Sequence, residues 1–294
     1  MSEITLSVII CTRNRANDLA NCLHELSTQS SEFSDVEIIV VDNGSSDNTR
    51  QVVEGFMQNP LPPVKYTVED KEGLCVARNR GRRAARGEVL AYIDDDAVPH
   101  SGWVASIREH FSNRLSDCIA GRVVVRPDGN LPEWFTPNLL HILGKTDYGV
   151  NMRLLNFPEC PTGCNFALRA EVFDRLGGFD ERLTYYHDEA EFFARVSAAG
   201  LLTMYRSDVA IDHCISPARL SKPSLRKKAR MMGKGAGKAK TLHGVSKADR
   251  LKWIVEHIAR TAYVGFAWCV GPRFDRAFTF WLNLGYLKQL IFNN

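Results

Sequence analysis

The chain reads Val89-Leu90-Ala91-Tyr92-Ile93-Asp94-Asp95-Asp96, an apolar run that ends in three consecutive acids. β-Branched and aromatic residues in such a run predict a buried strand. Three adjacent carboxylates repel one another unless a cation or a donor-rich ligand neutralises them. Ligands of open α/β sheets bind at the carboxyl ends of the strands, and oxygen-rich clusters there suit Mg²⁺ or Mn²⁺ together with substrate phosphates. A solvated acidic turn is the alternative, but the position after a strand favours a metal–phosphate site.

Size and composition are those of an ordinary globular protein. The 294 residues suit one large domain, or a domain with an appendage, and 45% hydrophobic with 24% charged residues is typical of that class. The eight cysteines are scattered, and the closest pair, Cys160 and Cys164, has no second pair at zinc-ligand spacing. The first residues lack the pattern of a signal peptide. We therefore expect reduced thiols and a cytoplasmic protein.

Apolar runs and helical spacings alternate along the first hundred residues. Strands are expected at 6–11, 36–41, 64–68 and 89–93, and helices at 17–26, 49–56 and 74–86. This alternation predicts an α/β fold with a mostly parallel, Rossmann-like sheet, right-handed crossovers and helices on both faces.

The later part of the chain is less regular. A strand is expected at 119–125, an irregular connection or lid at the proline-rich 127–160, helices at 170–176 and 188–199, and short strands at 201–205 and 209–211. We place a domain over residues 1–218, followed by a basic loop and a helical extension over 219–294. The uncharged run at 261–272 is shorter than the roughly 20 residues that a membrane-spanning helix needs.

Basic residues dominate from Arg219 to Lys252, and Gly233, Gly235 and Gly237 loosen the middle of this run. It has three interpretations: a solvated loop, a segment that closes over a bound diphosphate, or a surface that approaches anionic lipid head groups. Nucleic-acid binding is not expected, because no recognition motif accompanies the basic residues. Tryptophans in the neighbouring terminus favour either peripheral contact with the inner face of a membrane or a homodimer contact.

The usual glycine loops for nucleotides are absent. Cys11-Thr12-Arg13-Asn14-Arg15 stands where a dinucleotide-binding fold has its G-x-G-x-x-G turn, and the chain has no P-loop motif. Arg13 and Arg15 can instead supply charge and donors to a phosphate, with surface salt bridges as the alternative. Asp42 ends the second strand, where it can accept hydrogen bonds from a nucleoside or belong to a plain turn. Two strands therefore end in acids at one edge of the predicted sheet.

Eight segments carry a family resemblance: 8–14, 38–47, 73–81, 93–96, 163–166, 177–181, 188–191 and His213. In number, order and spacing they resemble the motifs of the family-2 inverting glycosyltransferases, which have the A-type glycosyltransferase fold, and Asp94-Asp95-Asp96 matches the DXD motif of that fold. The resemblance covers roughly residues 5–215. It implies a donor-binding half at about 1–98 and an acceptor-side half at about 99–218.

The resemblance also implies roles for individual residues. The donor, expected to be a UDP-sugar, would be contacted by Thr12, Arg13, Arg15, Asp42, Arg78, Asp94 and Asp95. Asp96 and His213 would bind Mn²⁺ or Mg²⁺, although a lone histidine is more often structural. The acceptor side would include Gly163, Asn165 and Asp180.

A carboxylate base must take the proton from the acceptor hydroxyl if inversion occurs in one displacement. The candidates lie in the segment 185–191, where the family usually shows Glu-Asp and this chain has the reverse order, Asp188-Glu189. Register with Glu191 and Phe192 puts Glu189 at the base position, and a shift of one residue would present Asp188 instead. Acids are also favoured at a helix amino terminus by its dipole alone.

The expected function is metal-dependent, inverting transfer of a sugar to a hydroxyl of a saccharide or lipid-linked acceptor, in polysaccharide or glycoconjugate biosynthesis. A sugar nucleotidyltransferase is one alternative, but it should carry a glycine-rich, lysine-containing first loop. A catalytically silent binding or assembly subunit is the other, and only the reversed pair Asp188-Glu189 favours it.

Overall fold

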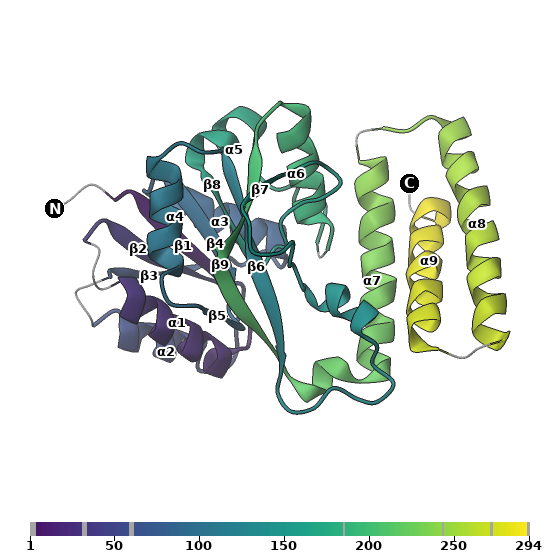
Figure 1. The fold of residues 1–294 in the computed structure, drawn as a ribbon, viewed down its shortest axis with the longest axis horizontal. Helices are drawn as coiled ribbons and strands as arrows, with labels where there is room; N and C mark the ends of the chain where they lie inside the picture. The colour runs from purple at the N-terminus through teal and green to yellow at the C-terminus, as the bar shows by residue number, and fades with distance from the viewer. Residues whose placement is uncertain are drawn as a thin grey trace. The chain divides into compact units, whose positions relative to one another are not determined.

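The computed structural model of the protein describes residues 4–30, 34–58, 62–184, 186–242, 244–270 and 273–292 (Figure 1). They form two compact units. The first contains the chain up to Arg126 with Gly144–Glu181 and Glu189–Cys214, and the second contains Pro127–Leu143, Arg182–Asp188 and the chain from Ile215 onward. Residues 1–3, 185, 243, 271–272 and 293–294, which belong to stretches interpreted above, lie outside the described residues.

Four parallel strands form one half of the sheet in the first unit (Figure 1). Their order is β3 (Val64–Val68), β2 (Val36–Asp42), β1 (Leu6–Thr12) and β4 (Val89–Asp94), and the connecting helices are α1 (Ala16–Ser30), α2 (Thr49–Phe56) and α3 (Leu74–Ala84). These elements confirm the predicted strands and helices of this half, with ends shifted by a few residues. Because Thr12 pairs with Asp42 and Cys11 with Asp94, three strand ends meet at one edge.

The other half of the sheet contains antiparallel pairs. β8 (Asn165–Arg169) pairs with β4, and β6 (Cys118–Pro127), β9 (Thr203–Ile215), β5 (Ala97–Pro99) and β7 (Arg153–Leu155) complete the nine strands of the described residues. The helices along this part of the chain are α4 (Trp103–Ser112), α5 (Ala170–Leu176) and α6 (Asp188–Ala198). The predicted α/β class is confirmed, and the sheet is mixed: β8 runs antiparallel to its neighbours β4 and β6, and β5 and β7 run antiparallel to β9.

One expectation for the later part of the chain is wrong in detail. The two short strands predicted at 201–205 and 209–211 are one continuous strand, β9, which pairs with β7 near its start and with β5 near its end. The stretch 127–160, predicted to be irregular, contains the 3₁₀ helix η1 (Pro137–Leu143) and the short strand β7.

Aromatic side chains fill the core beside β4 and β8 in the first unit. Tyr92 stacks on Phe166 with 4.8 Å between ring centroids, and Phe166 meets Phe193 of α6 edge to face at 5.7 Å. Aromatic pairs of this kind contribute about 0.5–1.5 kcal/mol beyond their area burial. The contacts fix α6, which carries Glu189, against the strand that leads into Asp94-Asp95-Asp96.

The second unit is built from three long helices, α7 (Lys222–Thr241), α8 (Lys247–Val270) and α9 (Phe274–Phe292), preceded by the 3₁₀ helix η2 (Pro217–Leu220). The prediction of a basic loop is therefore wrong over 222–241, where the chain is helical. Ser221 caps α7 by accepting a hydrogen bond from the Ser224 amide at 3.3 Å. No helix among the described residues combines the length and the apolar character needed to cross a bilayer.

The glycines of α7 bring it close to α9, rather than loosening the chain. A Cβ on Gly233 would lie 1.9 Å from the Leu282 carbonyl oxygen, and one on Gly285 would lie 2.1 Å from the Arg230 carbonyl oxygen. Only glycine allows the two backbones to approach this closely.

We expect Gly233→Ala to lower the free energy of unfolding by at least about 2 kcal/mol, because overpacking against a backbone outweighs the better helix propensity of alanine. Chemical unfolding followed by tryptophan fluorescence measures it. Gly55→Ala in α2 is the matched control: nothing lies within 4 Å of its added Cβ, so a gain of about 0.5–1 kcal/mol is expected. A stabilised Gly233→Ala protein would show that the close contact does not exist.

Candidate active site

Three acids follow the end of β4 in the first unit, and their environments differ. The Asp94 side chain keeps 36% of its surface exposed, whereas Asp95 and Asp96 are buried. Asp94 is the last residue of β4, and β5 begins at Ala97, so the three acids lie at the junction between these two strands. The partly exposed Asp94 is the one that solvent or a ligand can reach most readily.

Thr12 and Arg15, which follow β1, hold the two buried acids. The Thr12 hydroxyl donates to Asp95 at 2.8 Å, and Nη1 of Arg15 lies 2.9 Å from Asp95 and 2.7 Å from Asp96. Burial raises the pKa of Asp95 to about 7, with Asp96 and Asp94 adding to the rise and Arg15 opposing it. Thr12, Arg15 and Asp95 therefore bind one another, and Arg15 offsets part of the repulsion within the acid cluster.

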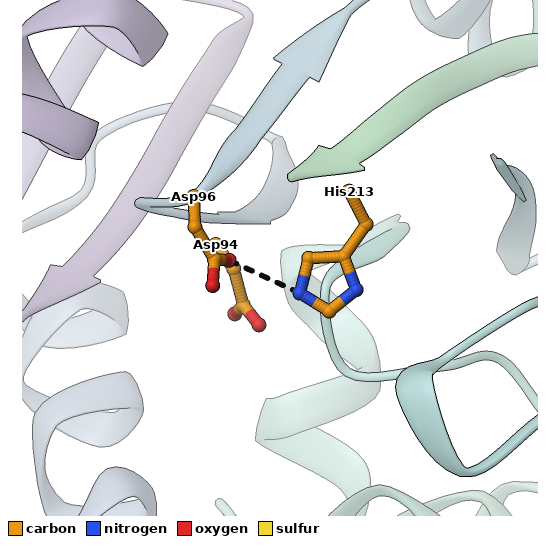
Figure 2. A group of neighbouring side chains, drawn as sticks. All are labelled: Asp94, Asp96 and His213. Atoms are coloured by element: carbon orange, nitrogen blue, oxygen red, sulfur yellow. Dashed lines mark ion pairs between the residues drawn. The ribbon is translucent and has the colours of Figure 1, made fainter. Parts of the chain in front are cut away.

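His213 joins the cluster from β9. Its partner across the β5–β9 ladder is Ala97, which places it beside Asp96, and its Nε2 lies 3.1 Å from Oδ1 of Asp96. Asp94, Asp96 and His213 each offer one ligand atom, and these atoms lie within 4.8 Å of one another (Figure 2). Figure 2 shows the imidazole turned toward the two carboxylates.

This donor set fits a divalent cation. Carboxylate oxygens suit Mg²⁺ and Mn²⁺, and imidazole nitrogen is accepted by transition metals. Two of the three side chains are buried, so their positions are fixed, and Asp94 leaves one side of the cluster open for further ligands.

Arg78 of α3 lies beside the cluster. Its buried guanidinium donates to the Gly163 carbonyl at 2.8 Å, lies 3.9 Å from Asp94, and packs over the rings of Phe166 and Phe179. A Cβ on Gly163 would lie 2.5 Å from Nη2 of Arg78, so glycine is what admits this side chain. The predicted donor residue Arg78 and the predicted acceptor residue Gly163 are thus brought together.

Asp42 lies at the end of β2, and its carboxylate accepts hydrogen bonds from the Tyr66 hydroxyl at 2.6 Å and from the Ser45 amide at 2.8 Å. Arg13 lies at the surface, 2.8 Å from Glu72. Sequence reasoning missed Tyr66, whose position in β3 carried no motif signal. Its hydroxyl holds the carboxylate of Asp42, the last residue of the neighbouring strand β2.

The two acids that begin α6 differ in exposure. Asp188 is 1% exposed, whereas Glu189 is partly exposed. Tyr186 and His187, just before them, have φ of 64° and 63°, in the left-handed region that non-glycine residues rarely adopt. Such strain often accompanies functional sites.

Glu189 also shares an electrostatic environment with the acid cluster. Burial is the main reason that the pKa of the Cys164 thiol is raised, and the charges of Asp94, Asp96 and Glu189 all add to it. The thiol of Cys160 likewise senses Glu189 after its own burial. Asp94, Asp96 and Glu189 therefore all lie near the Cys164 thiol.

Asn165 and Asp180 are held in other ways. The Asn165 amide accepts from the Trp103 indole at 3.0 Å and donates to the carbonyls of Arg122 and Val209, so its polar atoms are engaged inside the sheet. Asp180 follows Phe179, whose backbone N–H and C=O both bond to the Asn79 side chain at 2.9 Å. Asn79, also missed from sequence, ties the turn that contains Asp180 to α3.

Solved structures with the same fold include a mannosyltransferase from Pyrobaculum calidifontis in complex with GDP-Man and Mn²⁺. The likeness has a TM-score of 0.67 and covers 100% of this chain and 89% of that one, at 18% sequence identity. At this identity the likeness shows the fold.

Two curated relatives are closer in sequence. Glycosyltransferase AglE of Haloferax volcanii is 29% identical over 234 residues, which is 78% of this chain and 72% of AglE. Validoxylamine A glucosyltransferase of Streptomyces hygroscopicus subsp. jinggangensis is 30% identical over 233 residues, which is 70% of this chain and 55% of the relative. The model of glycosyl transferase family 2 matches residues 7–177, more than half of the chain, with all three strand ends and the acid cluster inside the match. The chain therefore belongs to glycosyl transferase family 2.

Proposed function

We propose that this glycosyltransferase moves a sugar from a nucleotide sugar, expected to be a UDP-sugar, to a hydroxyl of a saccharide or lipid-linked acceptor, with inversion at the anomeric carbon. The reaction would serve polysaccharide or glycoconjugate biosynthesis in the cytoplasm. The observation that carries the proposal is the cluster of Asp94, Asp96 and His213 at the edge of the sheet where three strand ends meet. Membership of the family favours sugar transfer over nucleotidyl transfer.

Asp96 and His213 would hold Mn²⁺ or Mg²⁺ from the buried side, and Asp94, more exposed, would contact the sugar or ribose and the ion. When bound, the ion neutralises the charge that develops on the departing diphosphate. Arg78 would aim a second, fixed positive charge at the same phosphates, because its guanidinium is already held by Gly163 and two rings.

The remaining donor residues would act in two groups. Arg13, half-exposed, and Asp42, fixed by Tyr66 and Ser45, would contact the nucleoside. Thr12, Arg15 and Asp95 would position the acid cluster through their mutual hydrogen bonds. The donor half would then be about residues 1–98.

Glu189 would act as the base that takes the proton from the acceptor hydroxyl. Its partial exposure and its closeness to the Cys164 thiol, which Asp94 and Asp96 also influence, support this role, and the burial of Asp188 supports a structural role for that residue. The acceptor half, about 99–218, would contribute Gly163 and Asp180, with Asn165 ordering the sheet beneath them.

A screen of nucleotide sugars by thermal shift, with and without Mn²⁺ or Mg²⁺, tests the function. A donor at a hundred times its Kd stabilises the folded protein by about 2.7 kcal/mol and therefore raises the Tm of the protein. Because the metal ion is expected to help hold the donor, we expect this rise only when the metal is present. Inorganic pyrophosphate with Mn²⁺ is the control for unspecific phosphate binding. A protein that no nucleotide sugar stabilises, and that hydrolyses none of them, would sink the proposal.

The helical extension over 219–294 would bind peripherally to an anionic membrane. Along α8 one face is apolar and open to solvent: Leu251, Val255, Ile258 and Phe266 are 51–70% exposed and recur at helical spacing. Cationic side chains of α7 in the same unit add attraction to anionic head groups. An interfacial helix shows this combination of an apolar face and nearby basic residues.

We expect Leu251→Asp with Phe266→Asp to reduce co-sedimentation with vesicles containing phosphatidylglycerol by at least tenfold, because burial of each side chain contributes about 1.5–3 kcal/mol. Val150→Asp is the control, since Val150 is 80% exposed in the first unit. If light scattering instead found a dimer that the double variant converts to a monomer, α8 would be a contact between two copies.

A further inference from the structure

The three helices of the second unit enclose a groove of about 1290 Å³. Its walls come from α7 and α9, with Trp268 of α8 and Trp134 also in the lining. Pockets for small ligands usually have volumes of about 300–1,000 Å³, so this groove has room for a ligand with a chain attached. It lies wholly within the second unit and shares no residue with the acid cluster.

One wall of the groove is cationic. Lys222, Arg226, Arg230 and Lys234 line it at intervals of four residues, which places them in one row along α7, and all four are exposed. None has a carboxylate partner among the described residues, and no acid is found in the described lining. Like charges at this spacing repel one another along a helix, and a bound anion would remove that repulsion.

The opposite wall is aromatic and aliphatic. The Arg226 and Arg230 guanidinium groups lie 3.6 Å and 4.3 Å from the ring centroid of Trp281, and Nζ of Lys222 lies 5.4 Å from that of Trp134. These stacked rings hold the cations in place beside the apolar surface. The groove ends at Ile291 and Phe292, which are 46% and 74% exposed, so its apolar surface opens to solvent at that end.

We propose that this groove is a binding site for a single lipid with a phosphate head group, whose phosphate is held by Arg226 and Arg230 and whose chain lies against Trp281 and toward Phe292. Two guanidinium groups one helical turn apart suit a phosphate, which each can bind bidentately. The mostly apolar α9 side, which includes Lys288, gives a hydrocarbon chain a place that a free phosphate or a nucleic-acid backbone would not use. The site does not depend on the transfer reaction.

The test is a titration of the full chain, without donor or metal, with dihexanoyl phosphatidic acid below its micelle concentration. Three of the five tryptophans line the groove, so their fluorescence reports binding. We expect saturable binding, at least ten times tighter than that of dihexanoyl phosphatidylcholine. Arg226→Glu with Arg230→Glu should weaken it at least tenfold, and Lys252→Glu with Arg260→Glu, which makes the same charge change on α8 outside the groove, should change it less than twofold.

Equal binding of the two lipids, or equal loss in both double variants, would overturn the proposal. Displacement by the same concentration of inorganic phosphate would show a free-phosphate site, and displacement by a short single-stranded oligonucleotide would show a nucleic-acid surface. If the charge-reversed protein does not fold, Arg226→Gln with Arg230→Gln, which removes the two positive charges without introducing negative ones, serves in its place. Asp96→Asn should bind the lipid normally, which separates this site from failure of the proposed transfer.

Discussion

Asp96→Asn is expected to lower the turnover of sugar transfer at saturating donor and Mn²⁺ by at least about a hundredfold. Asp96 is the most buried carboxylate of the candidate metal site, and its Oδ1 lies 3.1 Å from His213. The amide keeps the shape but loses the charge that holds the cation. Removal of one group that stabilises developing charge commonly costs about 10²–10³ in rate.

The same change should leave the fold intact. Arg15 still pairs with Asp95 in the variant, and the repulsion between neighbouring carboxylates decreases. We therefore expect the Tm without metal to be unchanged or raised, while calorimetric Mn²⁺ binding is weakened at least tenfold. Weaker Mn²⁺ binding without a loss of Tm is the result expected for a metal ligand, whereas loss of a structural acid would lower the Tm.

Asp212→Asn is the matched control for Asp96→Asn. Asp212 neighbours His213 on β9, but its carboxylate pairs with His100 at 2.9 Å and Arg126 at 3.1 Å, away from the cluster. Its turnover should stay within about twofold of the parent, since partly exposed ion pairs contribute little. Full activity and unchanged Mn²⁺ affinity in Asp96→Asn would remove the metal site from the mechanism.

The parallel half of the sheet could be predicted because its residues signal their structure locally. The apolar runs at 36–41 and 89–93 predicted two strands, and each strand in the structure extends one residue further, to Asp42 and Asp94. The late strand β9 could not, because it contains Arg206, Ser207 and Asp208 in its middle, a polar interruption that mimics a turn. Its continuity depends on pairing with β5 and β7, which are distant in sequence.

The same limit applies to the site. Asp94, Asp96 and His213 were identified by resemblance and lie together, but nothing local indicated that Arg15 would reach both Asp95 and Asp96. From the sequence, the glycines of α7 predict a loosened segment, because glycine has a low helix propensity. Their role depends on α9, fifty residues further along by sequence and in direct backbone contact in the structure.

Glu189→Gln is expected to lower kcat for transfer by about 10²–10⁴, the usual contribution of a general base, while the metal-dependent thermal shift by donor stays unchanged. The amide occupies the same space at the start of α6 but cannot take the acceptor proton. Initial-rate kinetics with saturating donor and acceptor measure the effect, and Glu189→Asp should recover part of the rate.

Asp188→Asn tests whether Asp188, instead of Glu189, is the base. Because Asp188 is 1% exposed, its replacement should alter stability more than turnover, whereas a base at this position would give the opposite result. Glu171→Gln, in the first turn of α5, is the control for loss of an acid at a helix amino terminus. We expect it to lower the free energy of unfolding by about 0.3–1 kcal/mol and to leave the turnover unchanged. If neither Asp188→Asn nor Glu189→Gln changed turnover, the reversed pair would not contain the base. If no transfer could be measured in the parent protein either, the chain would be a silent member whose acid cluster binds a donor without reacting.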